Sequence, residues 1–241
     1  MRTERIHEDT IKAVFFDLFG TLLPLAPLDV ACEAIAPGRG GELSKAWRAR
    51  QLELSWLRTI MGTWVDFDEV TRDGLDAALD ELDIAVGTDD RRRLAAAFQT
   101  LPLAAGAADV LAGLRAAGAQ TGILTNAATG TLRAVAARTG LERLTDHLLS
   151  VDPVRAFKPH PSVYRLATDA TGLPPASIGF VTGNGWDAAG AGAFGFRVTW
   201  LRAGPEAGIP RVGAPDPIAA SWSSLPEVLL DVDAQRVPRL G

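Results

Sequence analysis

The sequence predicts an α/β fold, in which a doubly wound parallel sheet carries an all-helical insert after its first strand. Four short apolar runs, rich in β-branched and aromatic residues, are typical of buried strands. Alanine- and leucine-rich helical patterns separate the last three runs, whereas a long stretch of helical patterns alone follows the first. Strands that alternate with helices indicate a parallel sheet with helices on both faces.

The four expected strands share one form, an apolar run that ends in glycine or small polar residues. The first is "KAVFFDLFG" at 12–20, and the others lie at 120–130, 177–187 and 196–204. Helical periodicity predicts the helices of this core at 107–118, 130–140, 161–172 and 188–195.

The stretch from about Leu25 to Leu101 breaks the alternation. Segments 42–61, 68–82 and 88–98 all have helical periodicity, and acidic or hydroxyl residues, which cap helices, open the second and third. Proline-containing segments at 24–27 and 101–103 are the expected hinges, because proline interrupts helices. We therefore expect a core formed by 1–24 and 101–241, and a helical subdomain formed by 25–100.

Composition excludes several classes of function. The chain has 241 residues, 47% of them hydrophobic, and its 29 acidic against 24 basic residues give a formal charge of -5. Without a basic cluster that could follow a phosphate backbone, a nucleic-acid partner is not expected. No apolar run reaches the roughly 20 residues of a membrane helix, and none near the start has the length of a signal peptide, so no membrane partner is expected.

Cysteine and histidine content bears on location and on metal binding. Cys32 is the only cysteine, which rules out an internal disulfide and fits the reducing cytoplasm. His7, His147 and His160 lack the spacing of metal ligands. We expect no metal centre and no cofactor.

Polar side chains stand where several of the predicted strands end. They are Asp17, Thr125, Asn184 and Asp187. In doubly wound sheets, ligands bind beyond the carboxyl ends of the strands, where the strand order reverses. The sequence therefore predicts an active site at this edge, with Asp17 as a nucleophile and with hydroxyl donors such as Thr21 to hold its carboxylate.

This order of parts resembles the haloacid dehalogenase-like superfamily, whose members have a Rossmann-like core with a helical cap inserted after the first strand. The resemblance rests on four motifs in order along nearly the whole chain. They are Asp17 with Gly20-Thr21, Thr125-Asn126, Lys158-Pro159, and the segment with Asn184 and Asp187.

Phe19 separates two branches of that superfamily. Its phosphatases usually carry a second aspartate at this position, which protonates the leaving alcohol, and they bind Mg²⁺ through carboxylates where this chain has Asn184. Phenylalanine cannot transfer a proton, and a hard cation prefers charged oxygens, so phosphoryl transfer is disfavoured. A halide leaving group needs no proton and therefore fits better.

Longer segments resemble the type II 2-haloacid dehalogenases of the superfamily. These segments are 37–67, 148–164 and 180–196, and the last contains an Asn-x-Trp-Asp arrangement that is typical of that subgroup. The resemblance implies hydrolysis of short (S)-2-haloacids to (R)-2-hydroxyacids. Asp17 would displace the halide to form an ester, water would then attack the acyl carbon, and Cα would be inverted once.

The resemblance also assigns roles to individual residues. Arg48, with Asn126, would stabilise the departing halide, and Thr125 would hold the substrate carboxylate. Lys158 and Tyr164 would support the nucleophile, and Asn184 and Asp187 would position or activate water. The substrate pocket would be lined by Phe19, Leu52, Phe67 and Trp186, with Thr182 among the substrate-binding residues.

Some features leave alternatives open. Thr125 and Thr182 replace serines of the family, and Gly183 replaces another, which leaves the substrate range open. A Mg²⁺-dependent phosphatase is one alternative; a catalytically silent homologue that binds a small carboxylate or a partner is another. The resemblance further implies a homodimer, with 42–61 as its expected surface, and a 2-haloalkanoic acid and a halide as small-molecule partners.

Overall fold

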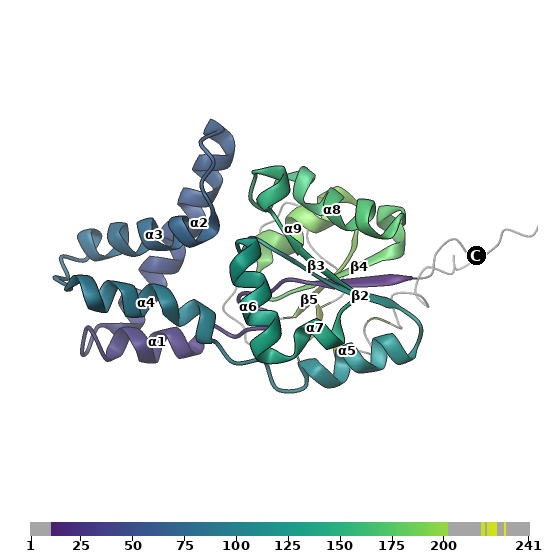
Figure 1. Ribbon diagram of the computed structural model, residues 1–241, viewed down its shortest axis with the longest axis horizontal. Coiled ribbons are helices and arrows are strands. Elements are labelled where there is room, and N and C mark those ends of the chain that lie inside the picture. Colours follow the sequence, from purple (N-terminus) through teal and green to yellow (C-terminus); the bar gives the residue numbers. More distant parts are fainter. Residues whose placement is uncertain (1–10, 202–217, 220, 226–228, 230–241) are drawn as a thin grey trace, which may run out of the picture.

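A computed structural model describes residues 11–201, 218–219, 221–225 and 229, and shows a parallel sheet of six strands in the order β3-β2-β1-β4-β5-β6 (Figure 1). All neighbouring strands run parallel. The predicted α/β class is therefore confirmed. The strands are β1 (Ala13–Phe16), β2 (Gln120–Thr125), β3 (His147–Ser150), β4 (Ile178–Thr182), β5 (Arg197–Leu201) and β6 (Ile218–Ala219).

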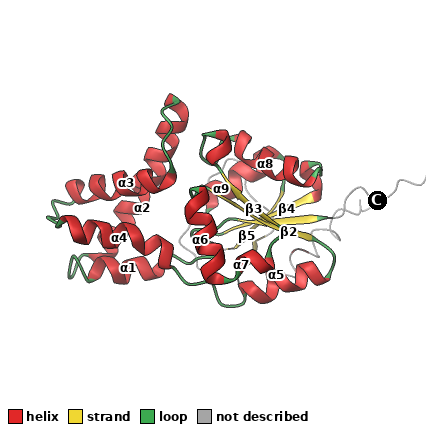
Figure 2. Ribbon diagram, viewed as in Figure 1, coloured by secondary structure: helices red, strands yellow, loops and turns green. Residues whose placement is uncertain are grey.

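Helices cover both faces of the sheet. Figure 2 shows α8 (Pro161–Thr171) and α9 (Gly185–Phe194) above it, and α5 (Ala107–Ala116) and α7 (Leu141–Leu144) below it. Helix α6 (Thr129–Thr139) packs against α7 and β3. Right-handed crossovers place successive helices on one face until the strand order reverses.

The strand order reverses at β1, which lies between β2 and β4. Phe16 of β1 is opposite Ile123 on one side and Val181 on the other. The N–H of Asp17 donates to the Val181 carbonyl at 3.0 Å, so this pairing continues one residue beyond the strand. Asp17 therefore lies at the switch point where ligands bind in such sheets.

Four helices follow β1 and lie to one side of the sheet in Figure 1: α1 (Ala26–Glu33), α2 (Gly40–Met61), α3 (Phe67–Glu81) and α4 (Thr88–Thr100). Helices α2 and α3 pack closely at Gly74, where an added Cβ would lie 2.9 Å from the Gln51 Cα. Trp47 is buried in the same contact and donates its indole N–H to the Thr71 carbonyl at 2.8 Å. The division into a 25–100 subdomain and a core stays a prediction.

The helical insert contacts the core through several hydrogen bonds close to the expected site. The Trp56 indole N–H donates to the Lys158 carbonyl at 3.2 Å, and the Phe157 N–H donates to the Thr59 hydroxyl at 2.9 Å. On the other side of the insert, the hydroxyl of Thr131 donates to Asp68 at 2.7 Å. These contacts hold α2 and α3 over the carboxyl edge of the sheet.

Several predicted boundaries were wrong. The 24–27 segment is not only a hinge, since α1 begins at Ala26 with Pro27 in its first turn, where proline needs no N–H partner. Helix α9 begins at Gly185 instead of 188, which puts Trp186 and Asp187 in its first turn. The sequence reading missed β3, a four-residue strand of sequence HLLS without β-branched residues.

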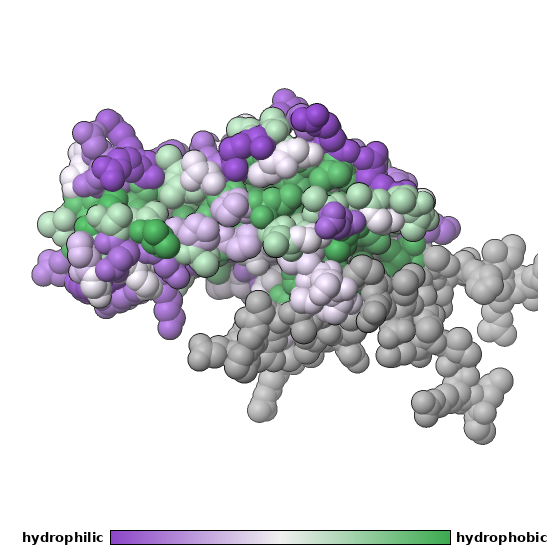
Figure 3. Space-filling model, turned by 90° about the horizontal axis from the view of Figure 1, so that it is seen from below, coloured by the Kyte–Doolittle hydropathy of each residue, from purple (hydrophilic) through white to green (hydrophobic). Residues whose placement is uncertain are grey.

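The surface is mixed in polarity. Figure 3 shows charged and polar residues around the outer edges of the insert and core, with hydrophobic residues visible between them. No helix within the described residues combines the length and apolar character that a bilayer crossing requires. His7 lies outside the described residues, and a cytoplasmic location stays a prediction.

Candidate active site

Asp17 stands immediately after β1, and its side chain is 7% exposed. The Thr21 hydroxyl and the Asn184 amide both donate to its Oδ2, at 2.9 and 2.8 Å. The ammonium of Lys158 donates to its Oδ1 at 3.0 Å. Three donors from three separate segments therefore fix the orientation of one buried carboxylate.

Two glycines lie close together at the turn after Asp17. Gly20 has φ of +85°, a conformation that side chains with a Cβ disfavour, and an added Cβ would lie 3.2 Å from the Asn184 amide. A Cβ on Gly183 would lie 2.2 Å from the Gly20 carbonyl oxygen. The Gly183 N–H donates to the Thr21 hydroxyl at 2.8 Å, which directs the hydroxyl proton toward Asp17. Glycine at 183 permits this close approach, and a side chain there would require one of the two backbone segments to shift.

Lys158 is the central cation of the site, and its side chain is 0% exposed. Its ammonium donates to Asp187 at 2.9 Å as well as to Asp17. Burial by itself lowers the pKa of Lys158, but attraction to the two carboxylates and hydrogen bonds to them outweigh burial and raise it. The backbone N–H of Lys158 donates to the side-chain oxygen of Asn126 at 2.9 Å, and this hydrogen bond fixes the loop that carries Lys158.

Asp187 is fully buried and forms the second anionic group of the site. The Tyr164 hydroxyl donates to its Oδ1 at 2.7 Å. Burial raises the pKa of Asp187 to about 6, because the attraction of Lys158 offsets it only in part. The pKa of Tyr164 is also raised, mainly by burial and further by the negative charge of Asp187. Gly190 makes this contact possible, because an added Cβ would lie 2.5 Å from the Tyr164 hydroxyl.

The donor set around the carboxylates does not fit a divalent metal ion. Both oxygens of Asp17 and both of Asp187 already accept hydrogen bonds from protein donors. The ammonium of Lys158 lies between the two carboxylates and contacts both, and Asn184 offers an amide where Mg²⁺ prefers a charged oxygen.

Arg48 brings a second cation from the insert. It lies on α2, is partly exposed, and donates to the Gln51 side chain at 2.6 Å. Burial lowers the pKa of Arg48 to about 10, against the attraction of Asp17 and Asp187. Because this pKa remains above neutrality, the guanidinium is charged and faces the electrostatic field of both carboxylates.

The neighbouring strand ends supply small polar groups. Thr125, the last residue of β2, is buried, and its hydroxyl accepts the Ala127 N–H at 3.1 Å. Asn126 is buried beside it. Thr182 is fully buried, and its hydroxyl accepts the Asn184 N–H at 3.1 Å. Thr182 thus supports the loop of Asn184, and a direct contact with substrate stays a prediction.

Aromatic side chains of the core pack against aromatic side chains of the insert. Phe19 meets Phe98 of α4 edge to face, with centroids 5.3 Å apart, and the Trp186 ring lies 5.8 Å from Trp56 of α2. Phe67 is buried at the start of α3. A cavity of about 240 Å³ lies against Phe19 and Phe67, and neither Asp17 nor Arg48 lines it. Leu52, one turn after Arg48 on α2, is half-buried.

Comparison with known proteins assigns this arrangement to a family. The family described as haloacid dehalogenase-like hydrolase matches residues 11–195. The chain belongs to the haloacid dehalogenase-like hydrolases.

Relatives within this family are mainly haloacid dehalogenases. The chain is 40% identical over 193 residues to the (S)-2-haloacid dehalogenase of Pseudomonas sp. (strain YL), covering 80% of this chain and 83% of that protein. It is 42% identical over 188 residues to the (S)-2-haloacid dehalogenase of Xanthobacter autotrophicus, covering 78% and 74%. The resemblance to type II dehalogenases is thereby confirmed.

A solved structure supports the same assignment. The L-2-haloacid dehalogenase of Xanthobacter autotrophicus with chloropropionic acid covalently bound superposes with a TM-score of 0.84 at 34% identity, covering 92% of this chain and 99% of that chain. The dehalogenase fold thus extends over the insert and the core together.

Sequence reasoning missed three residues of this dehalogenase-like site. Gln51 accepts a hydrogen bond from Arg48, and Thr71 in turn accepts one from Gln51. Trp56 donates to the backbone carbonyl of Lys158. The spacing of Gln51, three residues after Arg48 on one helix, is a signal that could have indicated the first contact. The other two depend on packing between segments distant in the sequence.

Removal of the Lys158 ammonium should destabilise the fold. In Lys158→Met, two buried carboxylates lose their shared counter-charge, and we expect a loss of about 3–5 kcal/mol in the free energy of unfolding, measured by urea denaturation. Arg92→Met, which removes an exposed arginine paired with Asp89, is the control and should leave stability near the wild-type value.

The deficit of Lys158→Met should also depend on pH. Without Lys158 the pKa of Asp187 rises further above its unfolded value, so the variant loses stability as pH rises through that pKa. The deficit should therefore be smaller at about pH 5 than at about pH 8. A pH-independent deficit would contradict this electrostatic account.

Proposed function

We propose that this protein hydrolyses short (S)-2-haloacids to (R)-2-hydroxyacids through an ester on Asp17. One observation carries the proposal: a buried, oriented carboxylate lies in the field of a charged arginine, and phenylalanine stands where a proton donor would be needed for an alcohol leaving group. The named relatives act on this class of substrate. The pairing of an oxygen nucleophile with a cation for the leaving group suits displacement of halide.

In the first step, an oxygen of Asp17 attacks the substrate Cα and the halide departs with the electron pair of the broken bond. Oδ1 is the more suitable attacking atom, because it accepts one hydrogen bond among the described contacts and keeps a lone pair for the attack. Oδ2 accepts two hydrogen bonds, from Thr21 and Asn184. Arg48, with Asn126, would stabilise the anion that leaves. Such stabilisation is stronger where aromatic walls exclude water.

Substrate orientation would come from the two kinds of surface around Asp17. Thr125 would hold the substrate carboxylate at the end of β2. Phe19, Leu52, Phe67 and Trp186 would surround the Cα substituent. A polar group on one side and an apolar wall on the other would favour one enantiomer, because the mirror-image acid would direct its substituent away from the apolar side.

In the second step, water attacks the acyl carbon of the ester and releases the hydroxyacid. Asp187 suits the role of general base, because a pKa of about 6 leaves it ionised at neutral pH yet able to accept a proton. Asn184 would position the water, and Lys158 would compensate the negative charge. Cα is displaced once in the whole cycle, so its configuration is inverted.

The two alternatives make different demands on the same residues. A Mg²⁺-dependent phosphatase would need a carboxylate where Asn184 stands, and a proton donor where Phe19 stands. A catalytically silent homologue would have no need for the buried Lys158, Asp187 and Tyr164 network. The geometry favours neither.

Chloride release tests the proposal against both alternatives. The purified protein should release chloride from (S)-2-chloropropionate but not from the (R) enantiomer, form (R)-lactate, and keep this activity in excess EDTA. Asp17→Asn should lower the rate by roughly 10⁴-fold, because it removes the nucleophile. EDTA-sensitive hydrolysis of p-nitrophenyl phosphate without chloride release would support the phosphatase; a folded protein inactive on both substrates would support the silent homologue.

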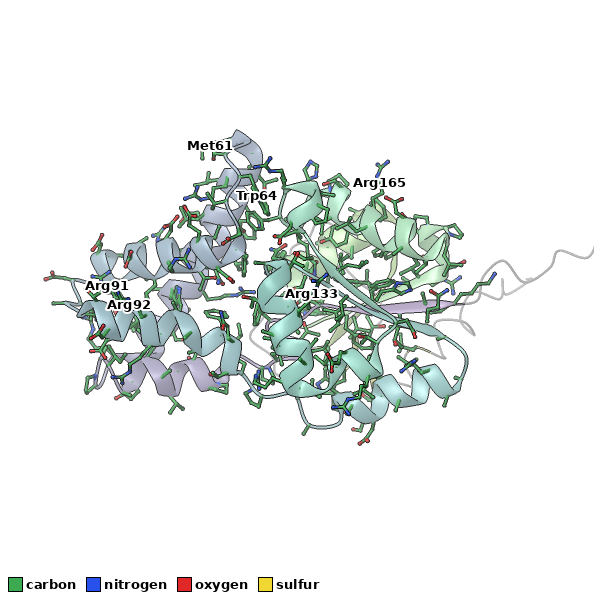
Figure 4. The ribbon with its side chains drawn as sticks, viewed as in Figure 1. Met61, Trp64, Arg91, Arg92, Arg133 and Arg165 are labelled. Carbon is green, nitrogen blue, oxygen red and sulfur yellow. The ribbon has the colours of Figure 1, made fainter. Side chains whose placement is uncertain are left out.

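We also infer a homodimer that uses the end of α2. Leu57, Ile60 and Met61 are 43%, 81% and 62% exposed, and Figure 4 places Met61 at the tip of α2, near Trp64. Exposed apolar groups that gather on one helix end favour association. A symmetric dimer would bury the same patch on both copies.

Substitution in this patch should change the oligomeric state. Ile60→Glu should shift the protein from dimer to monomer in sedimentation velocity, because it would bury charge in an apolar interface. Val30→Glu, at an apolar residue of α1 that is 72% exposed, is the matched control and should not. A monomeric wild type would refute the inference.

A further inference from the structure

Arg48 differs from most arginines of the insert in its partner. Arg39, Arg50, Arg58 and Arg91 each form an ion pair with a carboxylate. None of the ion pairs among the described residues includes Arg48, and its hydrogen bond goes to the neutral amide oxygen of Gln51 at 2.6 Å. Its positive charge is therefore held in place without being neutralised by a direct partner.

The amide of Gln51 is fixed by a directed chain of hydrogen bonds. The Thr71 hydroxyl donates its single proton to the Phe67 carbonyl at 2.6 Å, so the same oxygen must accept from Gln51. The Gln51 amide nitrogen donates to it at 2.6 Å. The amide oxygen consequently faces Arg48, because the reverse orientation would set the amide N–H groups against the N–H groups of Arg48 and the amide oxygen against a Thr71 oxygen whose proton is already donated.

The surroundings make this chain rigid. Gln51 is fully buried and Thr71 is 5% exposed, and the helices that carry them approach closely at Gly74. Each polar atom of the two side chains has a partner, so neither can rotate without leaving a buried group unsatisfied. The chain ends on the backbone of Phe67, which lies against the cavity beside Phe19.

We propose that Gln51 and Thr71 are positioning residues that hold the Arg48 guanidinium toward the departing halide while leaving its charge uncompensated. The proposal rests on the proposed function, in which Arg48 receives that halide. A glutamate at 51 could make the same contact, but its charge would compete with the halide for the guanidinium in a site with little water. A neutral carbonyl orients the cation at a lower electrostatic cost.

Two substitutions separate charge from geometry. Gln51→Glu keeps the size and the acceptor but adds a negative charge beside Arg48. Thr71→Val keeps the volume but removes the group that orients the amide. Gln120→Glu adds the same charge at the start of β2, at the opposite edge of the sheet from Asp17, and serves as the matched control.

Halide inhibition and the choice of leaving group report on Arg48 more directly than activity alone. We expect Gln51→Glu to raise the inhibition constant of bromide by about tenfold and Thr71→Val to raise it severalfold. In both variants kcat should fall more for 2-chloropropionate than for 2-bromopropionate, because chloride departs less readily, whereas KM should change little. Gln120→Glu should match the wild type.

The outcomes distinguish this inference from the proposed function. Folded Gln51→Glu and Thr71→Val with unchanged bromide inhibition and an unchanged chloride-to-bromide ratio of kcat would overturn it. If the wild type releases no halide, the proposed function fails. In that case, the shift in Tm on adding bromide measures bromide binding and tests the positioning role alone. The inference still requires Gln51→Glu to bind bromide more weakly than Gln120→Glu does.

Discussion

The site depends on one ammonium group held between two buried carboxylates. Lys158 donates to Asp17 and Asp187 at 3.0 and 2.9 Å, and without it two like charges would face each other away from water. The charge of Lys158 keeps the two carboxylates together in the core. The carboxylates nevertheless differ in their hydrogen-bond partners and in their burial. Asp17 is oriented by Thr21 and Asn184, whereas deeper burial raises the pKa of Asp187 into the range of a general base.

The two parts of the chain contribute different charges to the proposed reaction. In the proposed reaction, the core supplies the nucleophile Asp17, the base Asp187 and Lys158 at the carboxyl edge of the sheet, and α2 supplies Arg48. Contacts from Trp56 to the Lys158 carbonyl and from Phe157 to Thr59 hold the parts together beside the site. An in-line displacement would require the attacking carboxylate and the cation for the leaving anion to lie on opposite sides of the substrate Cα.

The sequence was informative where local pattern determines position. Asp17, Thr125 and Asn184 follow apolar runs, and parallel strands bring such ends together, so their convergence was predictable. Lys158 and Tyr164 follow no such rule, and only resemblance indicated them. The relay from Arg48 through Gln51 to Thr71 depends on how α2 packs on α3 at Gly74, which periodicity does not reveal. The close approach of Gly183 to the Gly20 carbonyl likewise joins segments that are distant in the sequence, and no local pattern predicts it.

The central claim is that an oxygen of Asp17 itself forms the new bond to carbon. A single turnover with excess enzyme in ¹⁸O-labelled water tests it most directly, with mass spectrometry of both the protein and the product. The account predicts label in the Asp17 carboxylate and an unlabelled hydroxyacid, because water attacks the acyl carbon of the ester. Label in the hydroxyacid, with none in Asp17, would contradict it.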